Sequence, residues 1–263
     1  MSGTSLDGVD AVLARISRSG TVELIQTHYL PYPGSLREQL LALHAPQSNE
    51  IPLAACAANE LARLYAEAVE AVLVRTPPSR VRAIGCHGQT VRHCPADGYT
   101  LQIGNAALLA ELTGIAVVAD FRSRDIAAGG QGAPLVPAFH VQTLSHPDVH
   151  RVIANIGGIA NITDLSPNNT VRGWDTGPGN MLLDAWIKRH HGATFDRDGA
   201  WAASGTVDPG LLEALLAHDY LSLPPPKSAG REQFNLEWVD TVLARKRSAL
   251  APEDVQATLL EFT

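Results

Sequence analysis

The sequence predicts an α/β protein of two lobes. Short β-rich runs alternate with helical runs along the 263 residues, which is typical of a domain with a partly parallel sheet. A glycine-containing turn accompanies a pair of strand patterns at the start of the chain, and another accompanies a second pair at 151–165. Between the two pairs, the glycine-rich segment 129–134 interrupts regular structure. These observations predict one lobe at 1–132 and another at 133–263.

The first element is a turn rich in glycine and hydroxyl side chains, followed by a predicted hairpin over 9–25. Glycines let backbone N–H groups converge on an anion, hydroxyls add hydrogen-bond donors, and a neighbouring carboxylate can hold a metal ion. This is the chemistry of a nucleotide phosphate clamp, and an ordinary glycine-rich turn is the alternative. The turn consists of Gly3, Thr4, Ser5, Leu6, Asp7, Gly8, Val9 and Asp10.

Two better-known phosphate-binding loops are excluded. Gly3 and Gly8 have the spacing of the two glycines in the P-loop motif, but Val9 and Asp10 stand where that motif needs a lysine and a hydroxyl. No G-x-G-x-x-G sequence occurs, so the fingerprint of a dinucleotide-binding fold is absent as well.

The rest of the first lobe alternates between helices and strands. Ser35–Glu38 has the pattern of a capping box, and leucines at helical spacing follow it. Pro77 and Pro78 must end a longer amphipathic helix, and Gly114 stops a third helix. We predict helices at 35–43, 61–72 and 105–113, strands at 81–86, 100–103 and 115–119, and a buried Cys56 in the alanine-rich helical run.

Polar side chains follow two of these predicted strands. His87 and Gln89 come after the strand at 81–86, and Asp120 comes after the strand at 115–119. Because functional groups collect where the strands of an open α/β sheet end, these residues are candidates for a binding site.

The second lobe begins with the strands 151–156 and 159–165, joined by Gly157 and Gly158. Asp175 then lies at a strand-to-helix corner, where we expect unpaired backbone N–H groups suited to phosphate or sugar chemistry. A helix cap is the alternative role for this aspartate. A helix is predicted at 181–189, closed by Gly192, and another begins at Pro252.

Composition narrows the classes of partner. The net charge of −7 and the absence of a Lys/Arg run argue against a nucleic-acid surface, so a small-molecule substrate is favoured. No signal peptide and no apolar stretch long enough to cross a bilayer is found, which predicts a cytoplasmic protein that does not contact the membrane. The 3 cysteines fit reduced thiols, and the spacing of Cys86, His87, His93 and Cys94 matches no usual zinc pattern.

Several motifs in fixed order together resemble the anhydro-N-acetylmuramic acid kinase family, which belongs to the actin, sugar-kinase and Hsp70 superfamily. The resemblance extends over the whole chain. It implies an actin-like fold with two RNase H-like lobes. The motifs are Met1–Asp10, Ile84–Thr90, Ala119–Arg122 with Arg124 and Asp125, Gly129–His140, Asn155–Ile162, Asp175–Asn180 and Lys227–Asn235.

The resemblance also implies a reaction. Members of this family use ATP and Mg²⁺ to open the 1,6-anhydro bond of anhydro-N-acetylmuramic acid with water and to phosphorylate the freed O6. The product is N-acetylmuramic acid 6-phosphate, an intermediate of cell-wall peptidoglycan recycling. Residues 3–10 would then be the ATP phosphate loop, Gly157 and Gly158 a second phosphate turn, and Asp175 the general base that deprotonates the attacking water. Family members are typically homodimers.

Other assignments from the resemblance have a structural alternative. Arg122 and Arg124 would hold the lactyl carboxylate of the sugar, or they would form surface salt bridges. His87 and Gln89 would donate to sugar hydroxyls, or they would tie the loop after Cys86 to its neighbours. Asp7 or Asp10 would bind Mg²⁺, since Met1 stands where relatives in the superfamily often place a carboxylate. Residues 227–231 form either an ordered loop near the cleft or a solvated connector.

Two further functions stay open at this point. The chain could be another sugar kinase of the same superfamily, or an ATP-binding module without catalytic activity. The family's downstream glycine-rich turn and late acidic helix have no counterpart before Thr263. We therefore expect an incomplete second lobe and a fragment that binds ATP poorly and is inactive.

Overall fold

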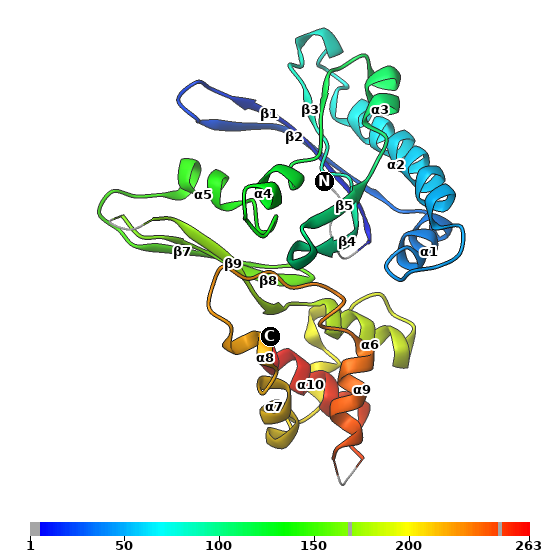
Figure 1. The fold of residues 1–263 in the computed structure, drawn as a ribbon, viewed down its shortest axis with the longest axis vertical. Helices are drawn as coiled ribbons and strands as arrows, with labels where there is room; N and C mark the ends of the chain where they lie inside the picture. The colour runs from blue at the N-terminus through cyan, green and yellow to red at the C-terminus, as the bar shows by residue number, and fades with distance from the viewer. Residues whose placement is uncertain (1–5, 168–169, 247–248) are drawn as a thin grey trace. The chain divides into compact units, whose positions relative to one another are not determined.

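The computed structural model describes residues 6–167, 170–246 and 249–263. Helices and strands are mixed throughout, so the predicted α/β class is confirmed. The chain divides into two compact units, Met1–Gly132 and Ala133–Thr263, which are described separately below (Figure 1). In the part of the chain that is described, no helix combines the length and the apolar character that crossing a bilayer requires.

An antiparallel hairpin opens the first unit, as predicted. Its strands are β1 (Gly8–Ile16) and β2 (Val22–Pro31), and their register shifts between Leu13 and Ala14. Gly8 pairs with Pro31, and a Cβ atom at Gly8 would overlap the carbonyl oxygen of Leu30. The close approach of β2 therefore requires glycine at this position.

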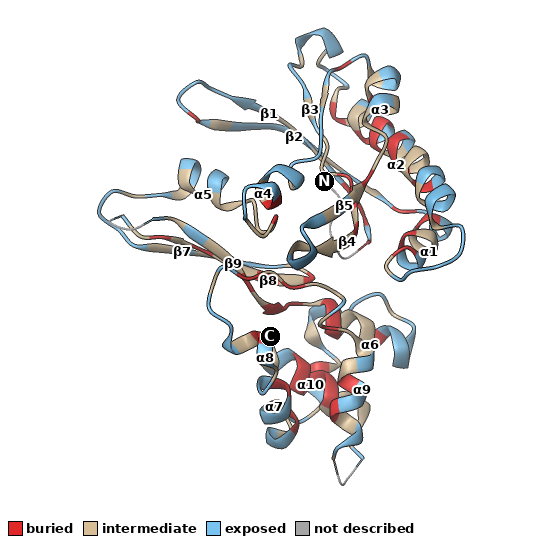
Figure 2. Cartoon of the chain, viewed as in Figure 1, coloured by how far each residue is buried: buried red, intermediate tan, exposed pale blue. Residues whose placement is uncertain are grey.

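Three helices cover the core of the first unit. They are α1 (Gly34–Ala42), α2 (Glu50–Val72) and α3 (Ala106–Thr113). Leu36, Leu40 and Leu43 are buried, which confirms the apolar spacing, and Figure 2 shows buried residues along α1, α2 and α3. Gly114 ends α3 in the left-handed conformation, as predicted.

Two local predictions in these helices are wrong. The capping box at Ser35–Glu38 does not form, because α1 begins at Gly34 after Pro33 and Ser35 already lies in the first turn. Cys56 is exposed rather than buried. The alanine-rich composition of α2 gives little information about which face of the helix is buried, because alanine is tolerated on both.

Short strand pairs complete the first unit. β3 (Ile84–Gly85) pairs in parallel with β6 (Val117–Val118), so the strands predicted at 81–86 and 115–119 form only in their central parts. β4 (Gln89–Cys94) pairs antiparallel with β5 (Tyr99–Ile103). Strand β4 was not predicted, because most of its side chains are polar and do not form the usual pattern of a strand. The short helical segment η2 (Pro95–Asp97) connects β4 and β5, whereas η1 (Pro78–Arg80) precedes β3 and α4 (Ser123–Ala127) follows β6.

The second unit contains an antiparallel sheet in the order β7-β8-β9. Its strands are β7 (Arg151–Ile156), β8 (Ile159–Leu165) and β9 (Arg172–Pro178), and the predicted arrangement of strand, glycine turn and strand is confirmed for β7 and β8. Helix α5 (Pro137–Leu144) is joined to β8 by a hydrogen bond of 2.9 Å between His140 Nδ1 and Thr163 Oγ1.

The remaining helices of this unit form a separate apolar core. Leu211, Leu215 and Phe234 are fully buried in it. Gly192 ends α6 in the left-handed conformation, which confirms its predicted role as a helix stop. The elements are α6 (Met181–His191), η3 (Arg197–Gly199), η4 (Ala202–Ser204), α7 (Pro209–Leu216), α8 (Asp219–Ser222), α9 (Leu236–Ala244) and α10 (Pro252–Phe262).

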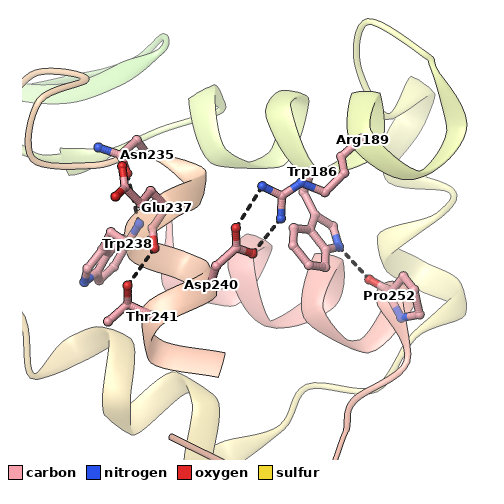
Figure 3. Close-up of polar contacts among 8 residues, drawn as sticks. All are labelled: Trp186, Arg189, Asn235, Glu237, Trp238, Asp240, Thr241 and Pro252. Carbon is pink, nitrogen blue, oxygen red and sulfur yellow. Dashed lines mark hydrogen bonds and ion pairs between the residues drawn. The ribbon is translucent and has the colours of Figure 1, made fainter. Parts of the chain in front are cut away.

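Polar contacts link three of these helices (Figure 3). The indole Nε1 of Trp186 on α6 donates to the carbonyl oxygen of Pro252 at 2.9 Å. The guanidinium of Arg189 makes two bonds, of 2.6 and 3.0 Å, to the carboxylate of Asp240 on α9. These contacts fix α6 against both α9 and the start of α10.

Candidate functional site

The predicted phosphate loop is described only from Leu6 onward, and Gly3, Thr4 and Ser5 lie outside the described residues. Leu6 is fully buried and has a φ of 56°, in the left-handed region that residues other than glycine seldom adopt. Strained backbone of this kind concentrates at functional sites. The side chains of Leu6 and Val9 are buried and anchor the described part of this turn, residues 6–10, in the core, whereas Asp7 and Asp10 are exposed.

Asp7 and Asp10 are exposed and influence the same tyrosine. The Asp7 carbonyl accepts hydrogen bonds from the Tyr29 hydroxyl and from the Tyr32 N–H, each at 3.0 Å. Partial burial, and then the negative charges of Asp7 and Asp10, raise the pKa of Tyr29. Asp7 and Asp10 are the carboxylates of this turn, and Mg²⁺ typically takes one or two protein carboxylates together with substrate phosphates.

A cavity of about 870 Å³ lies beside this loop within the first unit. Its walls come from β1, from α2 and from the segment 80–88. Asp10 and His87, which are far apart in sequence, both line it. Cavities of this size are typical of small-molecule sites.

His87 is held as a neutral imidazole by two fixed partners. Its Nδ1 lies 2.7 Å from the Gly88 carbonyl oxygen, and Arg122 Nε donates to its Nε2 at 2.8 Å. Since a carbonyl only accepts and a guanidinium only donates, the proton must reside on Nδ1. Burial, and then the charge of Arg122, lower the pKa of His87 from 6.5 to about 4.

The structure thus brings two of the predicted substrate residues together. Arg122 also donates through Nη1 to the carbonyl oxygen of Gly132, so it links the loop after β3 to the end of the first unit. Arg124 is exposed on α4. Gln89 is fully buried, and its side chain accepts from the Tyr32 hydroxyl at 3.2 Å, which favours the loop-tying alternative for this residue.

The cysteine and histidine group forms no metal site. Among the described residues, no three or more His, Cys, Asp or Glu side chains gather in a way that could hold a metal ion. His93 instead lies 3.0 Å from the Thr100 hydroxyl through its Nδ1.

Asp175 lies in β9 of the second unit and is only 5% exposed. Its carboxylate Oδ2 accepts the Ala229 N–H at 3.0 Å. Its own N–H donates to the Lys227 carbonyl at 3.2 Å, and its carbonyl accepts the Tyr220 hydroxyl at 2.7 Å. The side chain therefore does not cap the following helix, which has no side-chain cap.

The glycine turn between β7 and β8 packs against the start of α6. The Gly157 carbonyl accepts the Asn180 N–H at 2.8 Å, and the Gly158 carbonyl accepts the N–H groups of Gly179 and Met181 at 2.9 and 3.3 Å. The expectation of unpaired N–H groups at this corner is therefore wrong for these three residues. The nearby turn supplies carbonyl acceptors that the sequence did not indicate.

Lys227 belongs to an ordered part of its loop, since its side chain is 9% exposed. This burial favours the ordered-loop alternative for residues 227–231, and Tyr220 had no predicted role. Tyr220 contacts Asp175 across 45 residues of sequence, so no local pattern could have indicated it.

Similarity to known proteins identifies the family of this chain. The profile of one family, Anhydro-N-acetylmuramic acid kinase, matches residues 1–263. A protein of that name from Thiobacillus denitrificans is 70% identical over 263 residues, which is 100% of this chain and 71% of the relative. Relatives with the same name from Nitrosospira multiformis and Nitrosomonas europaea are 58% and 55% identical, again over 100% of this chain and 72% of their own length. The chain belongs to the anhydro-N-acetylmuramic acid kinase family.

Proposed function

We propose that this protein is an ATP-dependent kinase that opens anhydro-N-acetylmuramic acid with water and phosphorylates O6. The observation that carries the proposal is the match over the whole chain to relatives of this name, up to 70% identical. The proposal includes an actin-like fold with RNase H-like lobes at 1–132 and 133–263, a cytoplasmic location and a homodimer. The sugar is the partner, and neither nucleic acid nor membrane takes part.

Nucleotide phosphates would bind the turn at residues 3–10, with Gly157 and Gly158 as the second phosphate turn. The exposed carboxylates of Asp7 and Asp10 would hold the Mg²⁺ ion. When bound, the ion would offset negative charge on the phosphoryl group during transfer. The buried side chains of Leu6 and Val9 hold the backbone of this turn in place while the nucleotide exchanges.

Asp175 is the proposed general base. It would take a proton from water as the water oxygen attacks the anomeric carbon, and the bond from that carbon to O6 would break. The freed O6 would then attack the γ-phosphorus of ATP, and ADP would leave. Since only 5% of Asp175 is exposed, the substrate water has to reach this small exposed part of the residue.

The first unit would supply contacts to the sugar. Arg124 is the more exposed of the two predicted arginines and suits the lactyl carboxylate, whereas half-buried Arg122 would act from its position against His87. His87 Nδ1 is bonded to the Gly88 carbonyl. Any contact of His87 with sugar hydroxyls would therefore come from the part of the residue that lines the cavity. Burial of Gln89 supports a structural role for that residue.

A product analysis tests the proposal. A complete enzyme, extended to the length of its relatives, is incubated with anhydro-N-acetylmuramic acid, ATP and Mg²⁺ in H₂¹⁸O, and the sugar products are examined by mass spectrometry. We expect N-acetylmuramic acid 6-phosphate with one ¹⁸O at the anomeric carbon. A kinase of another sugar would instead prefer a glucosamine-type substrate in direct competition.

Ligand-induced thermal shifts separate the enzyme from a nucleotide-binding module. A kinase of this specificity is stabilised by the anhydro sugar alone, because a ligand that binds only the native state raises its stability. A module without catalytic activity would respond to ATP and not to the sugar.

A further inference from the structure

The segment from Tyr220 to Ala229 covers the edge of β9 at Asp175. In an antiparallel strand, the N–H and C=O of one residue point to the same side. Both groups of Asp175 are bonded to this segment, to the Lys227 carbonyl and to the Tyr220 hydroxyl respectively. The Ala229 N–H adds a bond to the carboxylate itself. One segment thus fixes the peptide and the side chain of the proposed base.

Lys227 holds this segment together from within. Its ammonium Nζ donates to the carbonyl oxygens of Tyr220 and Leu221, at 3.0 and 3.2 Å, and lies 4.6 Å from the centre of the Tyr220 ring. Both carbonyls belong to the short helix α8, so the side chain ties the loop at 227 to that helix. Tyr220 is therefore fixed at its backbone and at its ring by the residue whose own carbonyl binds Asp175.

The environment of Lys227 is unusual for a charged group. Within the described residues, no carboxylate forms an ion pair with its ammonium, although its side chain is almost fully buried. Burying a charge without an opposite charge is costly. Burial accordingly lowers the pKa of Lys227, and burial followed by the charge of Asp175 raises the pKa of Tyr220. A residue kept at such cost points to a role other than stability.

We infer that Lys227 and Tyr220 are positioning residues that hold the carboxylate of Asp175 in place through the peptide of residues 227–229. The inference rests on the proposed function for the statement that Asp175 is the base. Hydrogen bonds to an ionised carboxylate favour its charged form, so loosening the Ala229 contact makes Asp175 easier to protonate.

The variants Lys227→Met and Tyr220→Phe test this arrangement in the 263-residue chain. Lys227→Met keeps an unbranched stem and removes the ammonium, whereas Tyr220→Phe removes one hydroxyl and no charge at neutral pH. Lys246→Met is the control, because it removes a half-buried ammonium from the same unit, one that pairs with Asp208. Retention of the native tryptophan emission spectrum establishes that each variant is folded.

The measurement is the ¹³C carboxyl titration of Asp175 by NMR, with its signal assigned by its loss in Asp175→Asn. We expect the titration midpoint to rise by about one pH unit in Lys227→Met and by about half a unit in Tyr220→Phe, and to stay at the parental value in Lys246→Met. In a complete enzyme, we also expect each variant to have a roughly tenfold lower kcat and an unchanged KM for ATP.

The inference is overturned if the titration midpoint of Asp175 keeps its parental value in both folded variants. It is also overturned if the midpoint rises equally in the Lys246→Met control. If Lys227→Met does not fold, Tyr220→Phe decides alone, since it preserves the ring and the charge. The proposed function fails separately, by full sugar phosphorylation in Asp175→Asn, and that result leaves the titration comparison intact.

Discussion

The proton on His87 is placed by geometry rather than by pH. The Gly88 carbonyl and the Arg122 guanidinium leave the ring no site for a second proton. In the unfolded chain the pKa of this histidine is 6.5, and in the folded chain it is about 4. The unfolded state therefore binds more protons between these values, and the stability of the first unit falls as pH drops from 6.5 toward 4.

His87→Gln should remove much of this acid sensitivity, because glutamine offers an acceptor to Arg122 and does not titrate. Lowering the pH from 7 to 5 should cost the parent about 2 kcal/mol of unfolding free energy through His87 and the variant none through this position. Urea denaturation followed by far-UV circular dichroism measures both. His93→Gln should remove a separate part of the acid sensitivity, because burial and then the charge of Arg122 lower the pKa of His93 as well. Identical pH dependence in the parent and in His87→Gln would contradict the assignment.

Asp175→Asn tests the proposed base directly. The amide keeps the size of the side chain and an oxygen for the Ala229 N–H, but it has no basic oxygen to take a proton from water. In a complete enzyme, we expect kcat for sugar phosphorylation to fall by roughly three orders of magnitude or more, with ATP affinity nearly unchanged. Steady-state kinetics and nucleotide titration give the two quantities. A variant within tenfold of the parental kcat would exclude this role.

At the scale of single elements, helix α9 depends on its N-cap residue, Asn235. The Asn235 side chain accepts the Trp238 N–H at 2.9 Å and donates to the Arg231 carbonyl at 3.0 Å. Figure 3 shows this residue at the start of the helix that carries Asp240. The cap thus joins α9 to the loop that follows Lys227.

Asn235→Ala should destabilise the second unit by about 1 kcal/mol, the usual cost of losing a side-chain N-cap. Asn235→Asp retains the acceptor and should recover most of the loss. Thr241→Ala on the exposed face of the same helix serves as the control and should change stability by less than about 0.5 kcal/mol. Urea denaturation monitored by tryptophan fluorescence measures all three, and a parental midpoint in Asn235→Ala would count against the cap.

The elements that the sequence predicted correctly carry strong local patterns. The leucines of α1, Gly114 after α3 and Gly192 after α6 act within a few residues of the feature that they determine. The strand β4 was missed because its partner β5, rather than its own composition, makes it a strand. The capping box failed because the N-cap of α1 is Pro33, two residues before the Ser35 that the pattern implied.

The candidate site could be predicted only in part, because some of its contacts join residues that are far apart in the sequence. Motif resemblance selected Asp175, His87 and Arg122, and the contact between His87 and Arg122 needed the fold to appear. The Tyr220 hydroxyl and the Lys227 carbonyl bind main-chain atoms of Asp175, and both residues lie far from Asp175 in the sequence, so no local pattern predicts these contacts. The paired N–H groups at the start of α6 were invisible for the same reason, because backbone carbonyls occupy them.

At the scale of the whole molecule, the two units differ in their tryptophan content. All 4 tryptophans of the chain lie in the unit Ala133–Thr263. Each unit has its own buried apolar cluster, so each is expected to unfold with its own cooperativity.

We therefore expect acidification from pH 7 to pH 5 to lower the circular dichroism midpoint while the tryptophan fluorescence midpoint moves less. His87 and His93, whose pKa values are lowered, lie in the unit without tryptophan. The lowered pKa values of Asp164 and Asp208 in the other unit act only in stronger acid, below the ordinary value of 3.8. Coincident movement of both midpoints would show that the units unfold as one.

The exposed thiol of Cys56 on α2 has a practical consequence. Maleimide chemistry selects accessible thiolates, so a dye acceptor could be attached there, with the two less accessible cysteines as slower competitors. The indole rings of the other unit would serve as energy-transfer donors without any engineered label. Transfer efficiency recorded while nucleotide is added would then report whether the spacing between the halves changes during turnover.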